Sequence, residues 1–264
     1  MKNNEFKDWQ PGRYLRFHGE RTQPTIDLAK RVGLADPKRI LDLGCGPGNS
    51  TAVLSALWPE AEIVGLDNSE TMLAEAGKTS SHIRWILHDA AEDMAFLGKF
   101  DIVFSNAALQ WLPDNEQLIP RLYGMLNPGG VLAVQVPYSR DLPAFTVLKE
   151  VTSRPEWREF FTDPTVFRLH HDYRFYYNVL CRLPGKLDLW QTEYIHIMDS
   201  ADAVLEWYKG TGLRPFMQKL ADEAVRERFL QAYAQCIGEI YRAQDDGKVL
   251  FPFKRIFFVK ERES

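Results

Sequence analysis

Cysteine is scarce in this chain. The 264 residues include three cysteines, at positions 45, 181 and 236. Their odd number and wide spacing give neither the pairs of a disulfide framework nor the short repeats of a metal site. The adjacent His170 and His171 would point to opposite sides of a strand, which makes them poor metal partners. We therefore expect free thiols, no bound metal and a reducing compartment.

Long apolar runs and dense basic segments are also missing. No stretch approaches the roughly twenty apolar residues of a membrane span, and Met1 to Glu5 contain no apolar segment. The formal net charge is -4 and the isoelectric point is near 5.9, whereas phosphate binding needs a basic surface. We expect a cytoplasmic protein that binds a small-molecule substrate, but no nucleic acid and no membrane. The oligomeric state stays open.

A glycine-rich loop is the most informative segment that the chain does contain. Asp42-Leu43-Gly44-Cys45-Gly46-Pro47-Gly48 follows the apolar run 39–41 and leads into a helical pattern that begins near Asn49. Alternate glycines let the backbone turn sharply and approach a ligand, and the helix start directs unpaired N–H groups at it. A dinucleotide-binding loop would read Gly-x-Gly-x-x-Gly. Here the third glycine comes one residue early, which speaks against a nicotinamide dinucleotide.

A carboxylate follows the next strand candidate at a spacing that suits a nucleoside. The apolar run 62–66 ends in Asp67, roughly twenty residues beyond the glycines. A carboxylate there can accept hydrogen bonds from both ribose hydroxyls. The run 83–88 ends in the same way, in Asp89. An acid at a strand end is also often only the cap of the following helix.

The order acid-x-Gly-x-Gly-x-Gly resembles the first motif of the class I S-adenosylmethionine-dependent methyltransferases. The resemblance implies that Asp42 lies near the cationic amino acid end of the cofactor, Asp67 on the ribose and Asp89 on the adenine. Glu92 and Asp93 stand close enough to Asp89 to compete for its role. The implied cofactor is S-adenosyl-L-methionine, and its product is S-adenosyl-L-homocysteine. The remaining expected cofactor-binding residues are Gly44, Gly46, Gly48, Asn49, Asn68, Ala90 and Asn106.

Alternating strand and helix patterns predict the fold class. Strand candidates at 100–105 and 131–136 flank a helical pattern at 118–126, which the sequence Asn127-Pro128-Gly129-Gly130 closes. Strands separated by helices indicate a mostly parallel sheet. We predict an α/β fold with a doubly wound, mostly parallel, seven-stranded sheet of the Rossmann-like class I methyltransferase type. Ligands bind outside the carboxyl ends of such strands, so the glycine loop, Asp67, Asp89 and Asn106 should converge.

The second half departs from this regular pattern. Residues 138–172 interleave arginines with aromatic residues, and three prolines there break any long helix. Further expected elements are a helix at 173–183, a strand at 188–198, helices at 201–209 and 223–242 around a break at 211–216, and a strand at 249–260. We expect one domain, 1–264, with a cofactor-binding core at 31–137. Its helical lid would comprise an N-terminal segment, 1–30, and substrate-capping insertions at 138–187 and 199–243.

The residue types in the lid indicate an acidic substrate. Arginine presents a planar fork that matches carboxylates, so several arginines around one cavity would suit a small polycarboxylate. Any single arginine can equally belong to a solvated helix face. Four segments, 14–21, 42–51, 108–114 and 211–215, together resemble the family of trans-aconitate 2-methyltransferases, and the resemblance is weakest over 139–173.

This narrower resemblance implies methyl transfer to a carboxylate of trans-aconitate, which gives a monomethyl ester. A carboxylate is already ionised at neutral pH, so no residue is assigned as acid or base, and the protein only has to position the reactants and exclude water. The expected substrate-binding residues are Tyr14, Arg21, Gln110, Trp111, Trp207 and Arg214.

Three alternatives remain open. The first is a methyltransferase of the same fold that acts on another small or carrier-bound carboxylic acid. The second is a nicotinamide-dependent oxidoreductase. The third is a non-catalytic protein that binds S-adenosylmethionine, although the lid rich in aromatic and arginine residues is hard to explain under it. Sequence does not separate the positional isomers of the ester.

Overall fold

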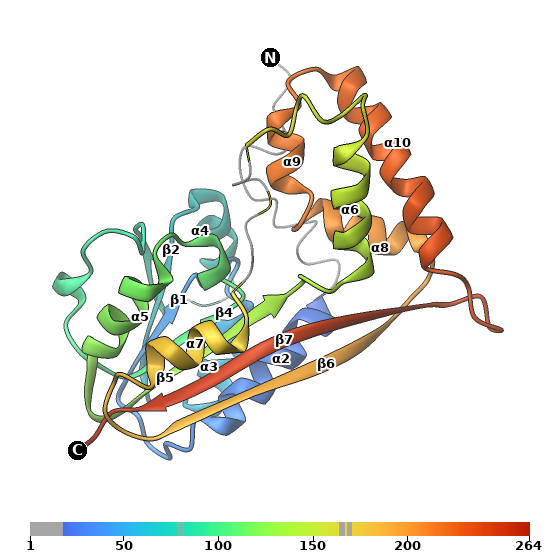
Figure 1. Ribbon diagram of the computed structural model, residues 1–264. Coiled ribbons are helices and arrows are strands. Elements are labelled where there is room, and N and C mark those ends of the chain that lie inside the picture. The colour runs from blue at the N-terminus through green and yellow to red at the C-terminus, as the bar shows by residue number, and fades with distance from the viewer. Residues whose placement is uncertain (1–17, 79, 81, 164–166, 168–170) are drawn as a thin grey trace. The chain divides into compact units, whose positions relative to one another are not determined.

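The strands form one seven-stranded sheet in the order β3-β2-β1-β4-β5-β7-β6 (Figure 1). The computed structural model describes residues 18–264 except 79, 81, 164–166 and 168–170, with side chains from residue 22 onward. The strands are β1 (Arg39–Leu43), β2 (Glu62–Asp67), β3 (Arg84–Leu87), β4 (Phe100–Asn106), β5 (Leu126–Tyr138), β6 (Leu187–Met198) and β7 (Val249–Glu261).

The first five strands pair in parallel. β1 lies between β2 and β4, β3 pairs with β2, and β5 pairs with β4. The arrows of β5 and β7 point in opposite directions in Figure 1, and the backbone N–H of Arg262 donates to the carbonyl of Gly130 at 2.8 Å. The predicted α/β fold with a mostly parallel, seven-stranded sheet is therefore confirmed.

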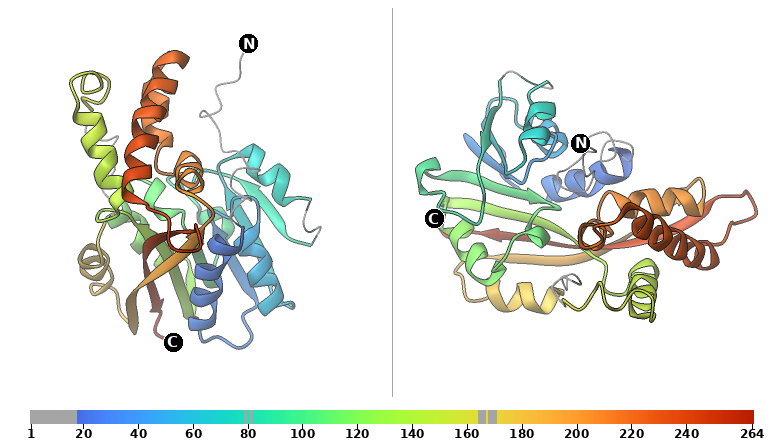
Figure 2. Two further views of the ribbon diagram at one scale, coloured as in Figure 1. Left: turned by 90° about the vertical axis from the view of Figure 1, so that its right-hand side faces the viewer. Right: turned by 90° about the horizontal axis from the view of Figure 1, so that it is seen from above.

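Helices cover both faces of the parallel strands. α2 lies on one side of the sheet, and α5 and α7 lie on the other (Figure 2, right). α2 packs on α3, and α5 packs on α7. The bounds are α2 (His18–Arg31), α3 (Asn49–Leu57), α4 (Glu70–Ala76), α5 (Asn115–Gly124), α7 (Tyr173–Leu180) and the 3-10 turns η1 (Ala95–Leu97) and η2 (Leu109–Trp111). Among the described residues, no helix has the length and apolar character that crossing a membrane requires.

The chain divides into two compact units. The sheet unit contains the described residues within 18–137, 171–192 and 255–264, and the helical unit contains those within 138–167 and 193–254. The predicted core, 31–137, belongs wholly to the sheet unit. The predicted insertion 138–187 contributes residues to both units, and 199–243 belongs to the helical unit. The assignment of these segments to a core and a lid stays a prediction.

The helical unit has a core of its own. Its helices are α6 (Pro143–Ser153), α8 (Ala201–Lys209), α9 (Arg214–Lys219) and α10 (Glu223–Ile240). α10 packs on α6 and α8. The Tyr233 hydroxyl donates to the carbonyl of Ala144 at 3.0 Å, and the Tyr241 hydroxyl accepts from the Ala144 N–H at 3.2 Å. Two tyrosines of the second half are thereby bonded to the first turn of α6.

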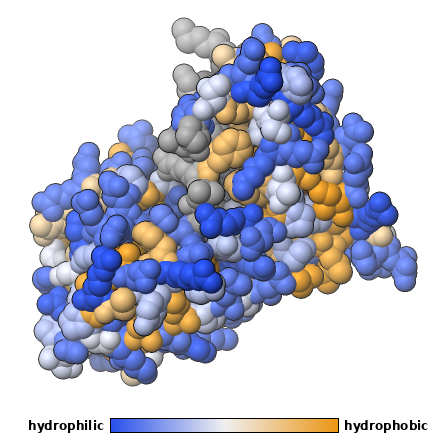
Figure 3. All heavy atoms as spheres, in the orientation of Figure 1, coloured by the Kyte–Doolittle hydropathy of each residue, from blue (hydrophilic) through white to orange (hydrophobic). Residues whose placement is uncertain are grey.

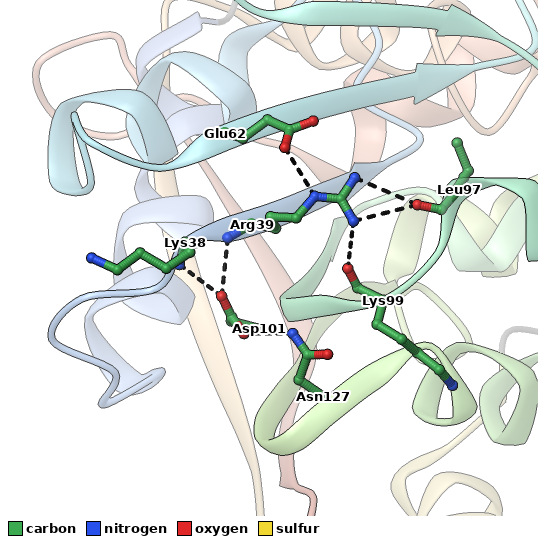
Figure 4. A network of polar contacts seen from close by, with 7 residues as sticks. All are labelled: Lys38, Arg39, Glu62, Leu97, Lys99, Asp101 and Asn127. Carbon is green, nitrogen blue, oxygen red and sulfur yellow. Dashed lines mark hydrogen bonds and ion pairs between the residues drawn. The ribbon is translucent and has the colours of Figure 1, made fainter.

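A polar network ties together the amino ends of β1, β2 and β4 (Figure 4). One carboxylate oxygen of Asp101 accepts from the backbone N–H groups of Lys38 and Arg39, at 2.7 and 3.0 Å. The other oxygen accepts from the amide of Asn127 at 2.7 Å. Arg39 donates to Glu62 at 2.9 Å. Ligands bind at the carboxyl ends of the strands in such folds. The network therefore fixes the edge of the sheet that lies opposite the ligand-binding edge.

Two differences from the sequence prediction, at β5 and at α9, have a clear structural cause. β5 begins at Leu126, because Leu126 pairs with Phe100 and the following turn residues are absorbed by a register shift before Ile102 pairs with Val131. The predicted break at 211–216 contains the start of α9, since Pro215 occupies the first turn of that helix, where a missing N–H costs nothing.

Candidate functional site

The glycine loop turns at the carboxyl end of β1. Gly44, Gly46 and Gly48 have φ angles of 71°, 54° and 92°, a region that side chains with a Cβ rarely adopt. A Cβ on Gly44 would also lie 2.2 Å from the Cβ of Ala108. The loop continues into α3, which begins at Asn49 and has no side-chain cap. The first N–H groups of α3 are thus not satisfied by a capping side chain.

Asp42 is fully buried beside this loop. Its Oδ2 accepts hydrogen bonds from the hydroxyls of Ser50 and Thr51, at 2.7 and 2.6 Å. Burial raises the pKa of Asp42 to about 6, against the two hydroxyls, which lower it, and with a contribution from the charge of Asp67. Two hydroxyls of α3 therefore hold the Asp42 carboxyl beside the loop, where burial makes its ionised form unfavourable.

Asp67 joins the loop to the end of β2. One oxygen accepts from the N–H of Gly46 at 2.9 Å, and the other accepts from the N–H of Ser69 at 2.9 Å. The carbonyl of Asp67 accepts from the N–H of His88 at 3.0 Å, which brings the end of β3 alongside. Each carboxylate oxygen can accept more than one hydrogen bond. Asp67 can therefore also accept hydrogen bonds from two vicinal hydroxyls, such as those of a ribose.

The segment after β3 is held by an arginine from α5. Asp89 accepts from the N–H of Ala91 at 2.9 Å. The Arg121 guanidinium donates to the carbonyls of Ala90, Ala91 and Glu92, at 2.8, 3.1 and 3.0 Å. This fork fixes the backbone around Asp89, at the carboxyl edge of the sheet.

Several buried polar atoms gather at this edge with no hydrogen-bond partner among the described residues. Buried polar groups are rarely left in this state, because desolvation without a hydrogen bond is costly. The atoms are Oδ1 of Asp42, Nδ2 of Asn49, Oδ1 of Asn106 and Oε1 of Gln110. Acceptors and a donor thus remain for a polar ligand with both kinds of group.

The chain is strained next to two of these residues. Ala107 has a φ of 54° without being glycine, a conformation that costs on the order of 1–3 kcal/mol and concentrates at functional sites. Its carbonyl accepts from the Gln110 amide at 2.6 Å, and its N–H donates to the carbonyl of Gln135 at 2.9 Å. The strained turn thereby directs Asn106 and Gln110 to the same edge.

The sheet unit brings together the predicted cofactor residues. Asp42, the three glycines, Asn49, Asp67, Asn68, Asp89, Ala90 and Asn106 all follow or end β1 to β4 at the carboxyl edge. Asn68 is exposed there, and Ala90 is buried. Their roles toward a cofactor stay predictions.

The predicted substrate residues are distributed differently. Gln110 and Trp111 form η2 in the sheet unit. Trp207 is buried in the helical unit. Its ring centroid lies 5.0 Å from that of His196 and 5.8 Å from that of Phe251. Arg214 begins α9 in the same unit. Tyr14 and the side chain of Arg21 lie outside the described part of the chain.

Sequence reasoning gave no functional role to Trp85 and Gln135 in this region, and it noted Arg255 only as one of several arginines that could surround a substrate cavity. Trp85 covers the loop from β3, and a Cβ on Gly65 would lie 2.5 Å from its ring. Gln135 and Arg255 are buried side by side on β5 and β7. Gln135 could have been found as the one polar residue in the apolar run 131–136.

Comparison with known proteins adds two kinds of similarity. A family model described as a methyltransferase domain matches residues 40–130. A trans-aconitate 2-methyltransferase from Acidovorax ebreus is 41% identical over 256 residues, which cover 97% of this chain and 98% of that protein. One from Methylobacterium radiotolerans is 42% identical over 260 residues, with 97% and 99% covered.

Solved structures resemble the chain in fold at low identity. The YcgJ protein from Bacillus subtilis has a TM-score of 0.58 at 15% identity, with 92% of this chain and 99% of that chain covered. A phosphoethanolamine N-methyltransferase 2 from Haemonchus contortus in complex with S-adenosyl-L-methionine has a TM-score of 0.54 at 18% identity, with 92% and 53% covered. The [4+2]-cyclase SpnF also reaches 0.54, at 15% identity, with 92% and 82% covered. The fold alone therefore does not decide the reaction.

Proposed function

The chain belongs to the family of trans-aconitate 2-methyltransferases, and from that premise we propose that its glycine loop and strand-end carboxylates hold S-adenosylmethionine for methyl transfer to a carboxylate of trans-aconitate. The observation that carries the assignment of this site is the fully buried carboxylate of Asp42. Its Oδ1 has no hydrogen-bond partner among the described residues. An acceptor in that state suits a cationic ligand.

We assign each carboxylate one part of the cofactor. Asp42, with the glycine loop and Asn49, would hold the amino acid end. Asp67, with its neighbour Asn68, would accept from the ribose hydroxyls. Asp89 and Ala90 would hold the adenine. The support is their common position at the carboxyl edge and the donor and acceptor types that they offer there.

The reaction makes modest demands on the protein. S-adenosylmethionine supplies a methyl group on a positively charged sulfur, and as a carboxylate oxygen bonds to that carbon the carbon–sulfur bond breaks, giving a methyl ester and S-adenosylhomocysteine. Because the carboxylate is ionised at neutral pH, we assign no acid or base. Gln110 and Trp111 would position the substrate and exclude water, which otherwise solvates the nucleophile, and Asn106 would contact the cofactor.

The partner of this site is a small carboxylic acid, and we infer that nucleic acid and membranes are not substrates. The net charge of -4 supports the first part of this inference, because a phosphate backbone requires a basic surface. The cysteines at 45, 181 and 236 are all free thiols, which supports a reducing compartment such as the cytoplasm. Trp207 and Arg214 remain predicted substrate residues.

The deciding experiment is mass spectrometry of the products that form from S-adenosylmethionine and a panel of di- and tricarboxylic acids. We expect one methyl group on trans-aconitate, in preference to cis-aconitate, citrate and isocitrate. Asp67→Ala should abolish most of this product, whereas Asp36→Ala, which removes an exposed carboxylate paired with Lys38, should not. If the wild-type protein binds S-adenosylmethionine but methylates none of the acids, the substrate assignment is wrong and carrier-bound acids come next.

A further inference from the structure

One amide side chain stands inside the buried, otherwise apolar stretch 131–136 of β5. Residues 131–136 of β5 are all buried, and Gln135 has no exposed surface. Its Nε2 has no hydrogen-bond partner among the described residues. A buried amide hydrogen without an acceptor costs free energy that an apolar residue of the same size would not. Gln135 therefore calls for an explanation other than packing.

A buried cation lies next to this amide. Arg255 is 4% exposed on β7, the neighbour of β5 in the sheet. Its Nη1 lies 3.5 Å from Oε1 of Gln135. Because the carbonyl oxygen of the amide is on the arginine side, its Nε2 is left as a donor next to a permanently charged group. The two side chains thus present N–H donors and a positive charge in one buried place.

The register of the sheet locates this pair relative to the proposed cofactor residues. Asp42 pairs with Phe104, and Phe104 pairs with Ala133, two residues before Gln135. Side chains two residues apart on a strand share a face, so Gln135 lies on the same face of the sheet as Asp42. It stands two strands away, about 10 Å across the sheet. Its partner in the register is Asn106, which is itself one of the expected cofactor-binding residues.

We propose that Gln135 and Arg255 form a subsite for one carboxylate of the substrate. The inference rests on the proposed function and adds a substrate-binding pair to it. The Nε2 of Gln135 and the Arg255 guanidinium would donate to the two carboxylate oxygens, with the charge of Arg255 as counter-ion. A neutral carbonyl or hydroxyl ligand would use the donors but gain little from the charge.

The subsite suits a carboxylate that does not react. A strong ion pair with the attacking carboxylate would stabilise the ground state more than the transition state, in which its negative charge disappears, and would slow methyl transfer. An ion pair with another carboxylate orients the substrate without this cost. The pair therefore favours polycarboxylic acids over monocarboxylic acids of the same size.

The first test separates substrate binding from cofactor binding. Gln135→Glu places a negative charge beside Arg255, and Gln135→Met removes the donor without a buried polar group to desolvate, so this second variant should fold as well as the wild type. We expect each to raise KM for trans-aconitate about tenfold or more and to leave Kd for S-adenosylmethionine within about twofold. Ser105→Ala is the matched control, because Ser105 is a buried polar residue of β4 that donates to the carbonyl of Leu43. An unchanged KM in both Gln135 variants would overturn the subsite.

The second test asks whether the pair recognises a carboxylate. Wild type and Gln135→Met are compared on trans-aconitate and on glutaconate, methylfumarate and itaconate, each of which lacks a different one of its three carboxylates. One dicarboxylate will lack the carboxylate that the Gln135–Arg255 pair binds. For that acid, kcat/KM should already be low in the wild type and should fall no further in Gln135→Met. An equal loss on all four acids would overturn the inference alone. A wild-type protein that methylates none of them would overturn the proposed function and this inference with it.

Discussion

At the scale of single residues, Asp42 couples the proposed cofactor site to pH. Burial raises its pKa to about 6, although Thr51 and Ser50 donate to it. The folded-state pKa of Asp42 lies above the ordinary value of an aspartate, near 3.8. Protonated Asp42 therefore stabilises the folded state below about pH 3.8, and this contribution is lost as pH rises through about 6. At neutral pH the ionised Asp42 therefore costs stability in the absence of a bound cation.

The affinity for S-adenosylmethionine should depend on this ionisation. A cationic group beside Asp42 requires the carboxylate, so we expect Kd to rise about tenfold for each pH unit below 6. Asp42→Asn should bind more weakly at pH 8 and lose this dependence. Calorimetric titrations between pH 5 and 8 measure both effects. The same pH slope in the variant would assign it to another group.

At the scale of elements, α5 holds the segment that follows β3. The carbonyls of residues 90–92 all accept hydrogen bonds from the guanidinium of Arg121. This one side chain therefore ties the segment to α5. Arg121 does not belong to the proposed binding groups. We expect it to act by holding the backbone around Asp89, a proposed adenine-binding residue.

Arg121→Met should therefore weaken cofactor binding without changing the chemistry. We expect Kd for S-adenosylmethionine to rise about tenfold, the equivalent of about one lost charge-assisted hydrogen bond, with kcat at saturation nearly unchanged. Arg121→Lys should recover little, because one ammonium group lacks the fork that reaches three carbonyls. Fluorescence titration measures Kd, and an unchanged Kd in Arg121→Met would refute the positioning role.

At the opposite edge, the network of Figure 4 serves stability rather than binding. Burial disfavours ionisation of Asp101, but hydrogen bonds from Asn127, Lys38 and Arg39 and the charge of Arg39 outweigh it and lower the pKa. A lowered pKa contributes stability that is present above the unfolded value near 3.8 and is lost as pH falls through the folded value.

Asp101→Ala should consequently reduce the free energy of unfolding by about 1–3 kcal/mol at pH 7. The difference from the wild type should shrink below about pH 4, as Asp101 becomes protonated in the wild type. Asp36→Ala removes an exposed ion pair with Lys38 and should change stability little. Urea unfolding from pH 3 to 7 supplies the data. A difference that persists undiminished at pH 3 would contradict the electrostatic explanation.

The elements that sequence predicted well are those set by neighbouring residues. The glycine loop and the strands before Asp67 and Asp89 follow from short-range patterns, and they occur at those positions. The early start of β5 depends on its pairing with Phe100, which lies outside any local pattern. The Gln135–Arg255 pair depends on β7 lying beside β5. Residues 120 positions apart in the chain share no pattern from which this contact could be read.

At the scale of the whole molecule, apolar residues are divided between two cores. Ile40, Val64 and Val103 belong to the core of the sheet unit, and Phe229 and Tyr233 to that of the helical unit. The face drawn in Figure 3 is mainly hydrophilic, with apolar residues in smaller groups. All assigned cofactor residues are in the sheet unit, so the cofactor should stabilise that unit directly.

Hydrogen exchange can measure this division. S-adenosylhomocysteine at one hundred times its Kd should protect β1, β2 and β4 by up to about 2.7 kcal/mol. Amides of α6, α8 and α10 should change less. Equal protection throughout would mean that the two cores open as one cooperative unit.

The order of strands in the sheet also bears on how the nascent chain acquires its structure. β7 lies between β5 and β6 but is the last of the seven along the chain. While the ribosome has made only the first six, β5 and β6 have no common neighbour, and β5 presents an open apolar edge of the kind that pairs with foreign strands. The parallel strands β1 to β5 can pack early, whereas the sheet is completed only after β7 has been synthesised. Rapid insertion of this strand, or a chaperone that covers the β5 edge meanwhile, would limit aggregation during synthesis.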